Sequence, residues 1–314
     1  MVKIKEIMDK GLLAKTEELD LKKNHGYYIK IGIVSETISF LISRNNEATE
    51  LTSENFLDDE RAMIPAQKWR AAERSYLLSE LRRLEGIIPN GYVRNMNKIR
   101  SNLKNPTSLL YGDTSIGSGV DMGSIASRCF YDWAYSFEPL GQISTRLVHN
   151  TLAEDGTILH SEAGKTESNA IYNIPYIKPG VKFVRFVTLE NCSIELLKLE
   201  ILAIVGCTRY GARTAILGDN INNKILSIGF SKGDKPISSY GLLEEAWKSN
   251  NYEPEKMVDS AMLDSYSAEY VLRDKDLEEF IKDTLGLVRD KVALKSMCEL
   301  INTKMENDWS EFWK

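Results

Sequence analysis

The segment 208–218 reads Thr-Arg-Tyr-Gly-Ala-Arg-Thr-Ala-Ile-Leu-Gly and holds the residue types that contact phosphates and bases. Arg209 and Arg213 can clamp phosphate oxygens, and Tyr210 can stack on a base or a ribose. Gly211 allows the backbone to approach a ligand closely. The alternative is a plain turn that places two arginines in solvent. The segment is therefore a candidate site for a nucleic acid or another phosphate-bearing partner.

A second basic group lies on a helix that the sequence predicts over 66–84, with Pro65 at its start and Gly86 at its end. Helical spacing puts three polar residues of this segment on one stripe, with a lysine beside it. Like charges four residues apart weaken an isolated helix slightly, and an anionic partner would explain their placement. A solvated face compensated by Glu73 is the alternative. The residues concerned are Gln67, Arg70 and Arg74, with Lys68 beside them.

The acidic residues and histidines give weaker evidence for a functional site. Asp58 and Asp59, followed by Glu60, could bind a metal ion or act as a general base, although acidic residues before a helix are also favoured by its dipole. His149 and His160 flank a predicted Asp-Gly turn, but the spacing supplies no further ligands. The sequence contains no CxxC pair, Walker A, GxSxG or GxGxxG motif, so we predict neither a metal site nor a cofactor.

Length and composition describe an ordinary globular chain. The 314 residues are 43% hydrophobic and 27% charged, with a net charge of −5, which excludes global disorder. A negative net charge argues against indiscriminate nucleic-acid binding but allows a local basic groove. The sequence shows no apolar run of about 18 residues and no secretory leader at its beginning. We therefore expect a reduced, cytoplasmic protein without a membrane partner.

The elements that must position these groups follow a mixed pattern. β-Branched and aromatic residues predict a strand over 27–43, in which Ile29, Ile31 and Ile33 share one face. Residues 44–60 and 164–179 are predicted loops, and 208–220 a basic turn and strand. With the helix over 66–84, the order is strand, helix, strand-like insert, strand, helix, strand. The later segments are β-like runs at 127–137 and 145–160, strands at 182–189 and 224–230, and a helix at 193–205.

This order predicts an α+β fold with a ferredoxin-like core, the arrangement that RNA-recognition motifs share. A charged lead-in precedes the core, a long insertion interrupts it, and a mostly helical region follows it. The predicted divisions are 1–26 for the lead-in, 27–239 for the core, 87–144 for the insertion and 240–314 for the helical region.

Three stretches then carry a resemblance to a known family. Residues 64–74 (Ile-Pro-Ala-Gln-Lys-Trp-Arg-Ala-Ala-Glu-Arg) resemble the Ile-Pro-Gly-x-x-x-Lys-x-x-x-Arg entry to the first helix of RAMP-superfamily CRISPR proteins. The others are Leu-Tyr-Gly-Asp at 110–113, and 179–218 with its Phe-Val-Arg-Phe-Val-Thr-Leu and Thr-Arg-Tyr-Gly-Ala-Arg-Thr segments. Over about 27–235 the chain looks like the backbone subunit of the type I-D CRISPR–Cas effector complex (Cascade), a Cas-seven family member. It departs from many relatives at Ala66-Gln67, and 104–109 carries no cysteine for a zinc site.

The resemblance implies an RNA-recognition-like core whose copies stack as a helical filament along the guide RNA (crRNA). It implies a β-hairpin thumb over 145–180 that reaches the neighbouring copy, with Arg146 contacting the guide backbone. It also implies other effector subunits and a target DNA or RNA as partners. Binding should tolerate any guide sequence, because base pairing reads the target. The implied guide contacts are Gln67, Lys68, Arg70, Arg74, Arg146, Arg209, Tyr210, Gly211 and Arg213.

Function is predicted to be structural rather than enzymatic, with two alternatives. In type III relatives an aspartate in the loop before the first helix cleaves target RNA, and Asp58 and Asp59 occupy a comparable place. A metal-dependent ribonuclease subunit is therefore the first alternative. A scaffold protein that binds no nucleic acid is the second.

Overall fold

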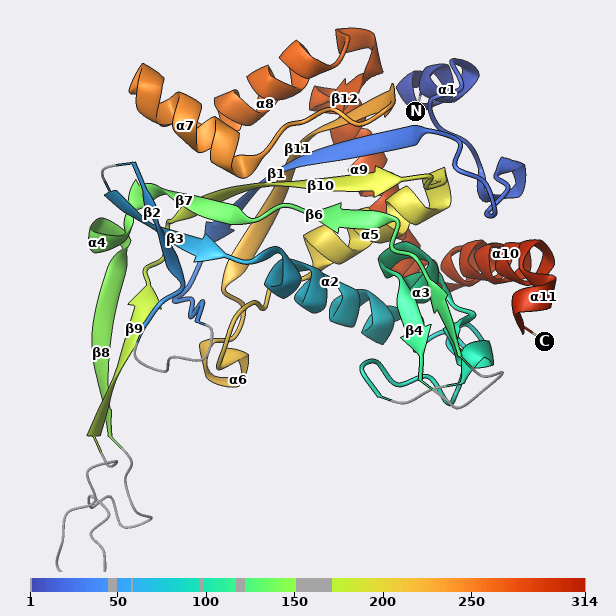
Figure 1. Cartoon of the computed structure of the whole chain (residues 1–314), viewed down its shortest axis with the longest axis horizontal. Coiled ribbons are helices and arrows are strands. Elements are labelled where there is room, and N and C mark those ends of the chain that lie inside the picture. The colour runs from blue at the N-terminus through green and yellow to red at the C-terminus, as the bar shows by residue number, and fades with distance from the viewer. Residues whose placement is uncertain are drawn as a thin grey trace, which may run out of the picture.

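The centre of the protein is an antiparallel sheet (Figure 1). The computed structural model describes residues 2–44, 50–57, 59–96, 99–116, 122–150 and 171–313. In this part of the chain eight strands form the main sheet, in the order β12-β11-β1-β10-β7-β3-β2, with β6 also paired to β10. Their bounds are β1 Tyr27–Thr37, β2 Ser53–Phe56, β3 Asp59–Ile64, β6 Cys129–Tyr131, β7 Ala134–Pro139, β10 Lys182–Glu190, β11 Ile221–Lys232 and β12 Val271–Arg273.

Helices cover both faces of the sheet, as Figure 1 shows. On one face lie α2 (Ala66–Leu81) and α5 (Ile194–Gly206), and on the other α7 (Ser239–Ser249) and α8 (Pro254–Ser265). Ile29, Ile31 and Ile33 are fully buried toward α5, as their period of two predicts. Val34 and Val258 belong to the core under α7 and α8. Strand β1 therefore lacks the polar face of an exposed strand, because both of its sides are covered.

Helices α2 and α5 pack closely because of one glycine. A Cβ atom at Gly206 would lie 2.3 Å from the ring atoms of Tyr76 on α2. The helix begins as predicted, since Ser193 caps it by accepting a hydrogen bond from Leu196 N (3.3 Å). Gly206 is the last residue of the helix and Cys207 is its C-cap, so the glycine serves helix packing.

The N-terminal residues belong to the core, which corrects their description as a lead-in. Helix α1 (Val2–Asp9) brings Ile4 and Ile7 into the main cluster, and Leu13 joins it from the segment between α1 and the short η1 (Thr16–Glu18). The C-terminal helices do the same through Phe280 and Ile301. They are α9 (Asp274–Arg289), α10 (Lys291–Asp308) and α11 (Ser310–Trp313), and β12 with η4 (Ala268–Tyr270) precedes them.

Three predicted loops or strands have other structures. The predicted loop 44–60 contains strand β2 and the start of β3, which pair as a hairpin from Ser53↔Ala62 to Phe56↔Asp59. The predicted strand within 208–220 is replaced by the one-turn helix α6 (Thr214–Leu217). The predicted loop 164–179 contains β9 (Ile171–Ile177). Long-range strand pairing, which these segments do not encode locally, decides the two β cases.

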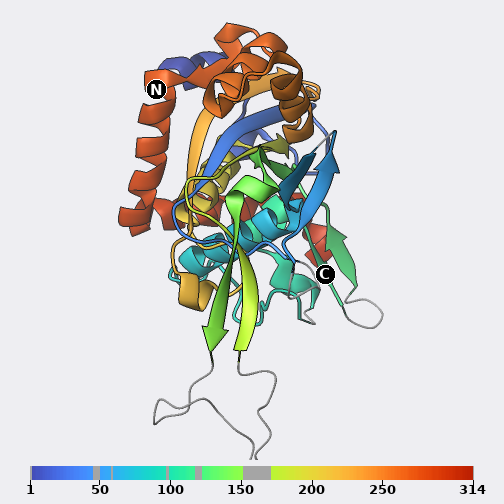
Figure 2. The ribbon, with the colours of Figure 1, turned by 90° about the vertical axis from the view of Figure 1, so that its left-hand side faces the viewer.

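Strands β8 (Ser144–Asn150) and β9 pair antiparallel and project away from the body (Figures 1 and 2). Arg146 lies opposite Pro175 in this ladder. The base joins the body through a bridge between Leu41 and Ile177 and through α4 (Leu140–Ile143). The predicted Asp-Gly turn and His160 lie outside the described residues.

The segment between α2 and β6 forms a small subdomain beside α2. It comprises η2 (Arg100–Leu103), α3 (Pro106–Tyr111) and the paired strands β4 (Asp113–Ser115) and β5 (Gly123–Ile125). Strands β6 and β7, which the sequence assigned to the same insertion, instead extend the main sheet. Among the described residues, no helix is both long enough and apolar enough to cross a membrane.

Candidate nucleic-acid interface

A cleft of about 440 Å³ lies between the first half of α2 and the segment that precedes α6. Four cationic side chains reach it from four separate parts of the chain, and no carboxylate is among the described residues that line it. An anion is the ligand that such a lining favours. We call it the basic cleft, and its lining residues are Arg44, Lys68, Ala71, Ala72, Ser75, Arg94, Arg209, Gly211, Ala212 and Thr214.

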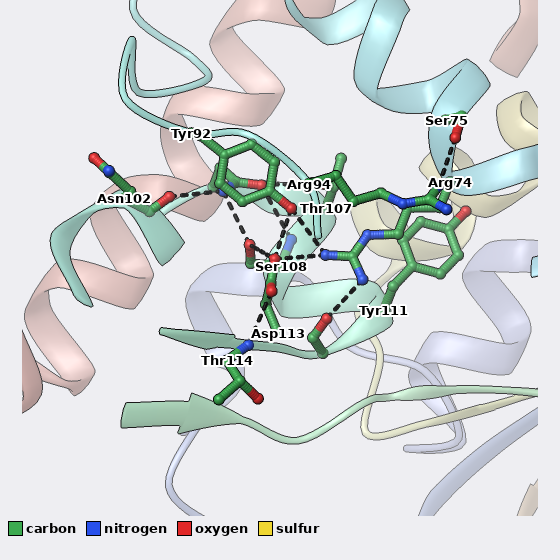
Figure 3. Close-up of polar contacts among 12 residues, drawn as sticks. Arg74, Ser75, Tyr92, Arg94, Asn102, Thr107, Ser108, Tyr111, Asp113 and Thr114 are labelled. Carbon is green, nitrogen blue, oxygen red and sulfur yellow. Dashed lines mark hydrogen bonds and ion pairs between the residues drawn. The ribbon is translucent and has the colours of Figure 1, made fainter. Parts of the chain in front are cut away.

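Two of its cations are partly withdrawn from water. The ammonium of Lys68 donates a hydrogen bond to the carbonyl of Arg44, and burial followed by the nearby Arg44 charge lowers the pKa of Lys68. Arg94 donates to Ala71 O (2.7 Å) and to Ser75 Oγ (Figure 3), and its pKa is lowered mainly by burial and then by Arg74. Crowded, half-buried cations are destabilised, and a bound phosphate would relieve that cost.

The structure brings together three predicted site residues, namely Lys68, Arg209 and Gly211. It adds Arg44 and Arg94, which sequence reasoning missed. Arg44 follows the first strand, and Arg94 lies in the predicted insertion, so neither is near the other cations in sequence. Only the packing of the chain around α2 joins them.

Arg70 and Arg74 point into the protein, which differs from their predicted contact with phosphates. Arg74 is 6% exposed and donates to Gly112 O (2.9 Å), to Tyr92 Oη (2.9 Å) and to Asp113 Oδ2 (2.6 Å) (Figure 3). Arg70 donates to the carbonyl of Tyr111 and lies over its ring. The part of the stripe that carries Arg70 and Arg74 therefore lies against the end of α3. The guanidinium of Arg74 therefore holds the Leu-Tyr-Gly-Asp segment and is not available to a phosphate in this structure.

Tyr210 is also an internal residue, whereas the sequence suggested that it stacks on a base. Its side chain is 2% exposed, its hydroxyl donates to Glu73 Oε1 (2.8 Å), and its ring meets Trp69 edge to face at 4.9 Å between centroids. Its backbone N donates to Asn220 Oδ1 (2.9 Å). A ring in this environment has no open face for a base. Tyr210 instead anchors the segment that carries Arg209 and Gly211.

Gly211 allows a close approach to the chain itself and not to a ligand. Its φ is +78°, and a Cβ atom there would lie 2.3 Å from the carbonyl oxygen of Ile42. The next residue, Ala212, donates its backbone N–H to that same oxygen at 3.0 Å. The glycine therefore joins the segment to the chain that follows β1, at Ile42.

We expect Gly211→Ala to lower the free energy of unfolding by about 3 kcal/mol, because a positive φ costs ~1–2 kcal/mol for an alanine and the contact with Ile42 adds the cost of overpacking. Gly86→Ala is the control, since Gly86 has a φ of +79° but nothing within 4 Å of its Cβ position. Urea unfolding of both variants measures the difference. Equal losses would show that the contact with Ile42 carries no cost.

The other predicted residues lie at or beyond the rim. The side chain of Arg209 is 67% exposed and forms an ion pair with Asp219 at 3.0 Å. Because both side chains are exposed, a phosphate can take the place of Asp219 at little cost in free energy. Arg213 is half-buried with a φ of 57° at the start of α6. Gln67 is exposed in the first turn of α2, and Arg146 is exposed on β8.

A family model described as "Csc2 Crispr" matches residues 14–305. The chain belongs to the Csc2 CRISPR family. The crystal structure of Thermofilum pendens Csc2 is 14% identical and has a TM-score of 0.54 over 95% of this chain and 94% of that chain, so the two share a fold.

Two further solved structures resemble this Csc2-family chain less. A chain of a CRISPR RNA-guided surveillance complex in a pre-nicking state is 13% identical, with a TM-score of 0.45 over 69% of this chain and 80% of that chain. Another chain of such a complex is 12% identical, with a TM-score of 0.44 over 70% and 75%. A search of curated proteins found no match.

Asp59 of the acidic pair does not line the basic cleft of this Csc2-family chain. Asp58 lies outside the described residues. Asp59 begins β3, so the length of that strand places it roughly 16 Å from Ile64 and the start of α2. It lines another pocket, together with Arg61 and Lys182. No group of three or more His, Cys, Asp or Glu side chains that could hold a metal ion occurs among the described residues. Cleavage by this pair stays a prediction.

Proposed function

We propose that this chain is the guide-RNA-binding backbone subunit of a type I-D CRISPR interference complex. Copies would stack along the crRNA and present it for pairing with a target DNA or RNA, beside other effector subunits. Membership of the Csc2 family supports this proposal. The observation that carries it is the basic cleft, which gathers four cations in a chain whose net charge is −5.

We infer that the core is of the RNA-recognition type. Strands β1, β7, β10 and β11 with helices α2 and α5 follow the β-α-β-β-α-β order, and β1 and β10, the first and third strands, lie in the centre. In RNA-recognition motifs the bases stack on an open sheet face. Here α7 and α8 cover that face. The guide would therefore lie along the basic cleft, with its phosphates rather than its bases against the protein.

The projecting strands β8 and β9 support the proposed contact with a neighbouring copy. Their base packs on the segment 208–218. Ile174 and Tyr176 form a buried cluster with Ile42, and Ala212 and Leu217 pack against this cluster. A guide phosphate in the cleft and a neighbour held by the strands would thus act on one connected region. Arg146, exposed on β8, is the proposed guide contact there.

The test is binding of single-stranded RNA across a salt series, for the protein and for the variants Lys68→Ala and Arg209→Ala. Each variant should weaken binding roughly tenfold, the worth of one charged hydrogen bond, and equally for unrelated RNA sequences. The slope of log affinity against log salt should become shallower by about 0.7 for each lost phosphate contact. Lys256→Ala is the control, because Lys256 is 79% exposed on α8.

Unchanged affinity and slope in both cleft variants would show that the guide lies elsewhere. Failure of the protein to bind RNA at low salt would favour the scaffold alternative. Mg²⁺ is included and the RNA length is checked afterwards, because shortened RNA would favour the ribonuclease alternative.

A further inference from the structure

Two fully buried carboxyl groups lie on either side of one phenol, between α2, α5 and β6. Glu73 and Glu200 are both 0% exposed. The hydroxyl oxygen of Tyr131 is 2.5 Å from Glu73 Oε2 and 2.6 Å from Glu200 Oε1. A phenol has one proton and can donate it to only one of these oxygens. The other short contact also needs a proton, so one of the two carboxyl groups must carry it.

The surrounding groups decide which carboxyl is charged. Glu73 receives Arg185 Nη2 at 2.6 Å and the hydroxyl of Tyr210 at 2.8 Å, both on Oε1. The hydrogen bond from the buried guanidinium is charge-assisted and pairs Arg185 with Glu73. Glu200 receives neutral donors, namely the Tyr111 hydroxyl at 2.7 Å and the Cys129 thiol at 3.4 Å. The proton therefore belongs on Glu200, which donates it to Tyr131, while Tyr131 donates to Glu73.

The environment of Glu200 agrees with this placement. Burial, followed by the charge of Glu73, raises its pKa to about 7, against the opposing effect of its hydrogen-bond donors. With Glu200 neutral, the buried charges of Arg185 and Glu73 cancel. Within the described residues, Glu200 contacts the titratable groups of Tyr111 from α3 and of Cys129 and Tyr131 from β6. Glu73 of α2 lies beyond Tyr131 and Arg185 of β10 beyond Glu73, and Arg70 and Arg74 of α2 lie over the ring of Tyr111.

We propose that Glu73, Tyr131 and Glu200 hold one buried proton on Glu200, and that its release to solvent loosens the segment carrying Arg209 and Gly211. The second part rests on the proposed function. Loss of the proton leaves one hydrogen between two carboxylates and an uncompensated negative charge in the core. The contacts of Glu73 are then in competition, and Glu73 is the acceptor for the hydroxyl of Tyr210, to which Asn223 also donates. Glu73 is thus a positioning residue for the basic cleft.

The first measurement is carbon NMR of the glutamate carboxyl groups between pH 5 and 9. One carboxyl should titrate near pH 7 and be missing from the spectrum of Glu200→Gln. The glutamine amide can donate to Tyr131 as the protonated acid does, so this variant should keep the fold, which circular dichroism checks. Absence of such a titration, or its persistence in Glu200→Gln, would overturn the shared proton.

The second measurement is RNA binding at pH 6 and pH 8. If proton release leaves the ordered segment about one-tenth populated, affinity should fall about tenfold in the natural protein and stay constant in Glu200→Gln. If the carboxyl titrates while the RNA affinity stays constant, the effect of the proton on the segment that carries Arg209 and Gly211 is overturned, but the assignment of the proton to Glu200 stands. A protein that binds no RNA at either pH would contradict the proposed function and the coupling, whereas the NMR titration would still decide on the proton.

Discussion

Arg185→Met is expected to lower the free energy of unfolding by about 3–5 kcal/mol, because it leaves Glu73 as an unpaired charge in the core. Both side chains are 0% exposed, and the guanidinium and carboxylate are 2.6 Å apart. Arg185 also donates from Nε to Ser35 Oγ at 3.0 Å and lies 4.3 Å from the ring centroid of Trp69. Equilibrium unfolding in urea near pH 7 measures the loss.

The double variant Arg185→Met/Glu73→Gln separates the charge from the packing. It removes the orphaned charge and keeps one amide oxygen, which can accept from either Tyr131 or Tyr210, so it should recover part of the lost stability. Lys248→Ala removes an exposed pair with Glu244 on α7 and should cost less than ~1 kcal/mol. If Arg185→Met costs no more than this control, the buried pair does not stabilise the fold.

The sequence predicts those elements whose signal is local. Strand β1 follows from the alternation of Ile29, Ile31 and Ile33, and α5 from its apolar run and the cap at Ser193. Helix α2 begins at Ala66 as Pro65 predicts. Strand β2 carries no such signal, since Ser-Glu-Asn-Phe is polar and is extended only because β3 pairs with it.

The candidate site could be predicted only in part, because periodicity does not say what covers a helix face. Lys68 and Arg74 lie on the same helix, yet Lys68 reaches the basic cleft while Arg74 is enclosed by α3 and Asp113. Tyr210 is separated by 137 residues from Glu73, which holds it inside. Arg94 joins the cleft across a similarly unmarked contact with α2. These assignments depend on tertiary packing, which a single sequence does not show.

The contribution of Glu200 to stability is expected to fall as the pH rises from about 4.5 to about 7. The ordinary pKa of a glutamate is 4.5, whereas burial raises that of Glu200 to about 7 in the folded protein. Between these values the unfolded chain has released the proton and the folded protein still holds it, so each rise in pH favours unfolding. Below about pH 4.5 both states are protonated, and above about pH 7 both are ionised. The difference between the two pKa values corresponds to about 3 kcal/mol.

Unfolding free energies of the natural protein and of Glu200→Gln, measured from pH 4.5 to 8, isolate this contribution. Subtracting the two curves removes the contributions of the other titrating groups. The remaining difference in unfolding free energy should change by about 3 kcal/mol and level off above pH 7. The sign is decisive. A Glu200 held ionised by its donors would have a lowered pKa and would add stability as the pH rises, so a difference curve of that slope, or a flat one, contradicts a buried proton. A falling curve requires that the folded protein binds one proton more than the unfolded chain, as the two short contacts of Tyr131 demand.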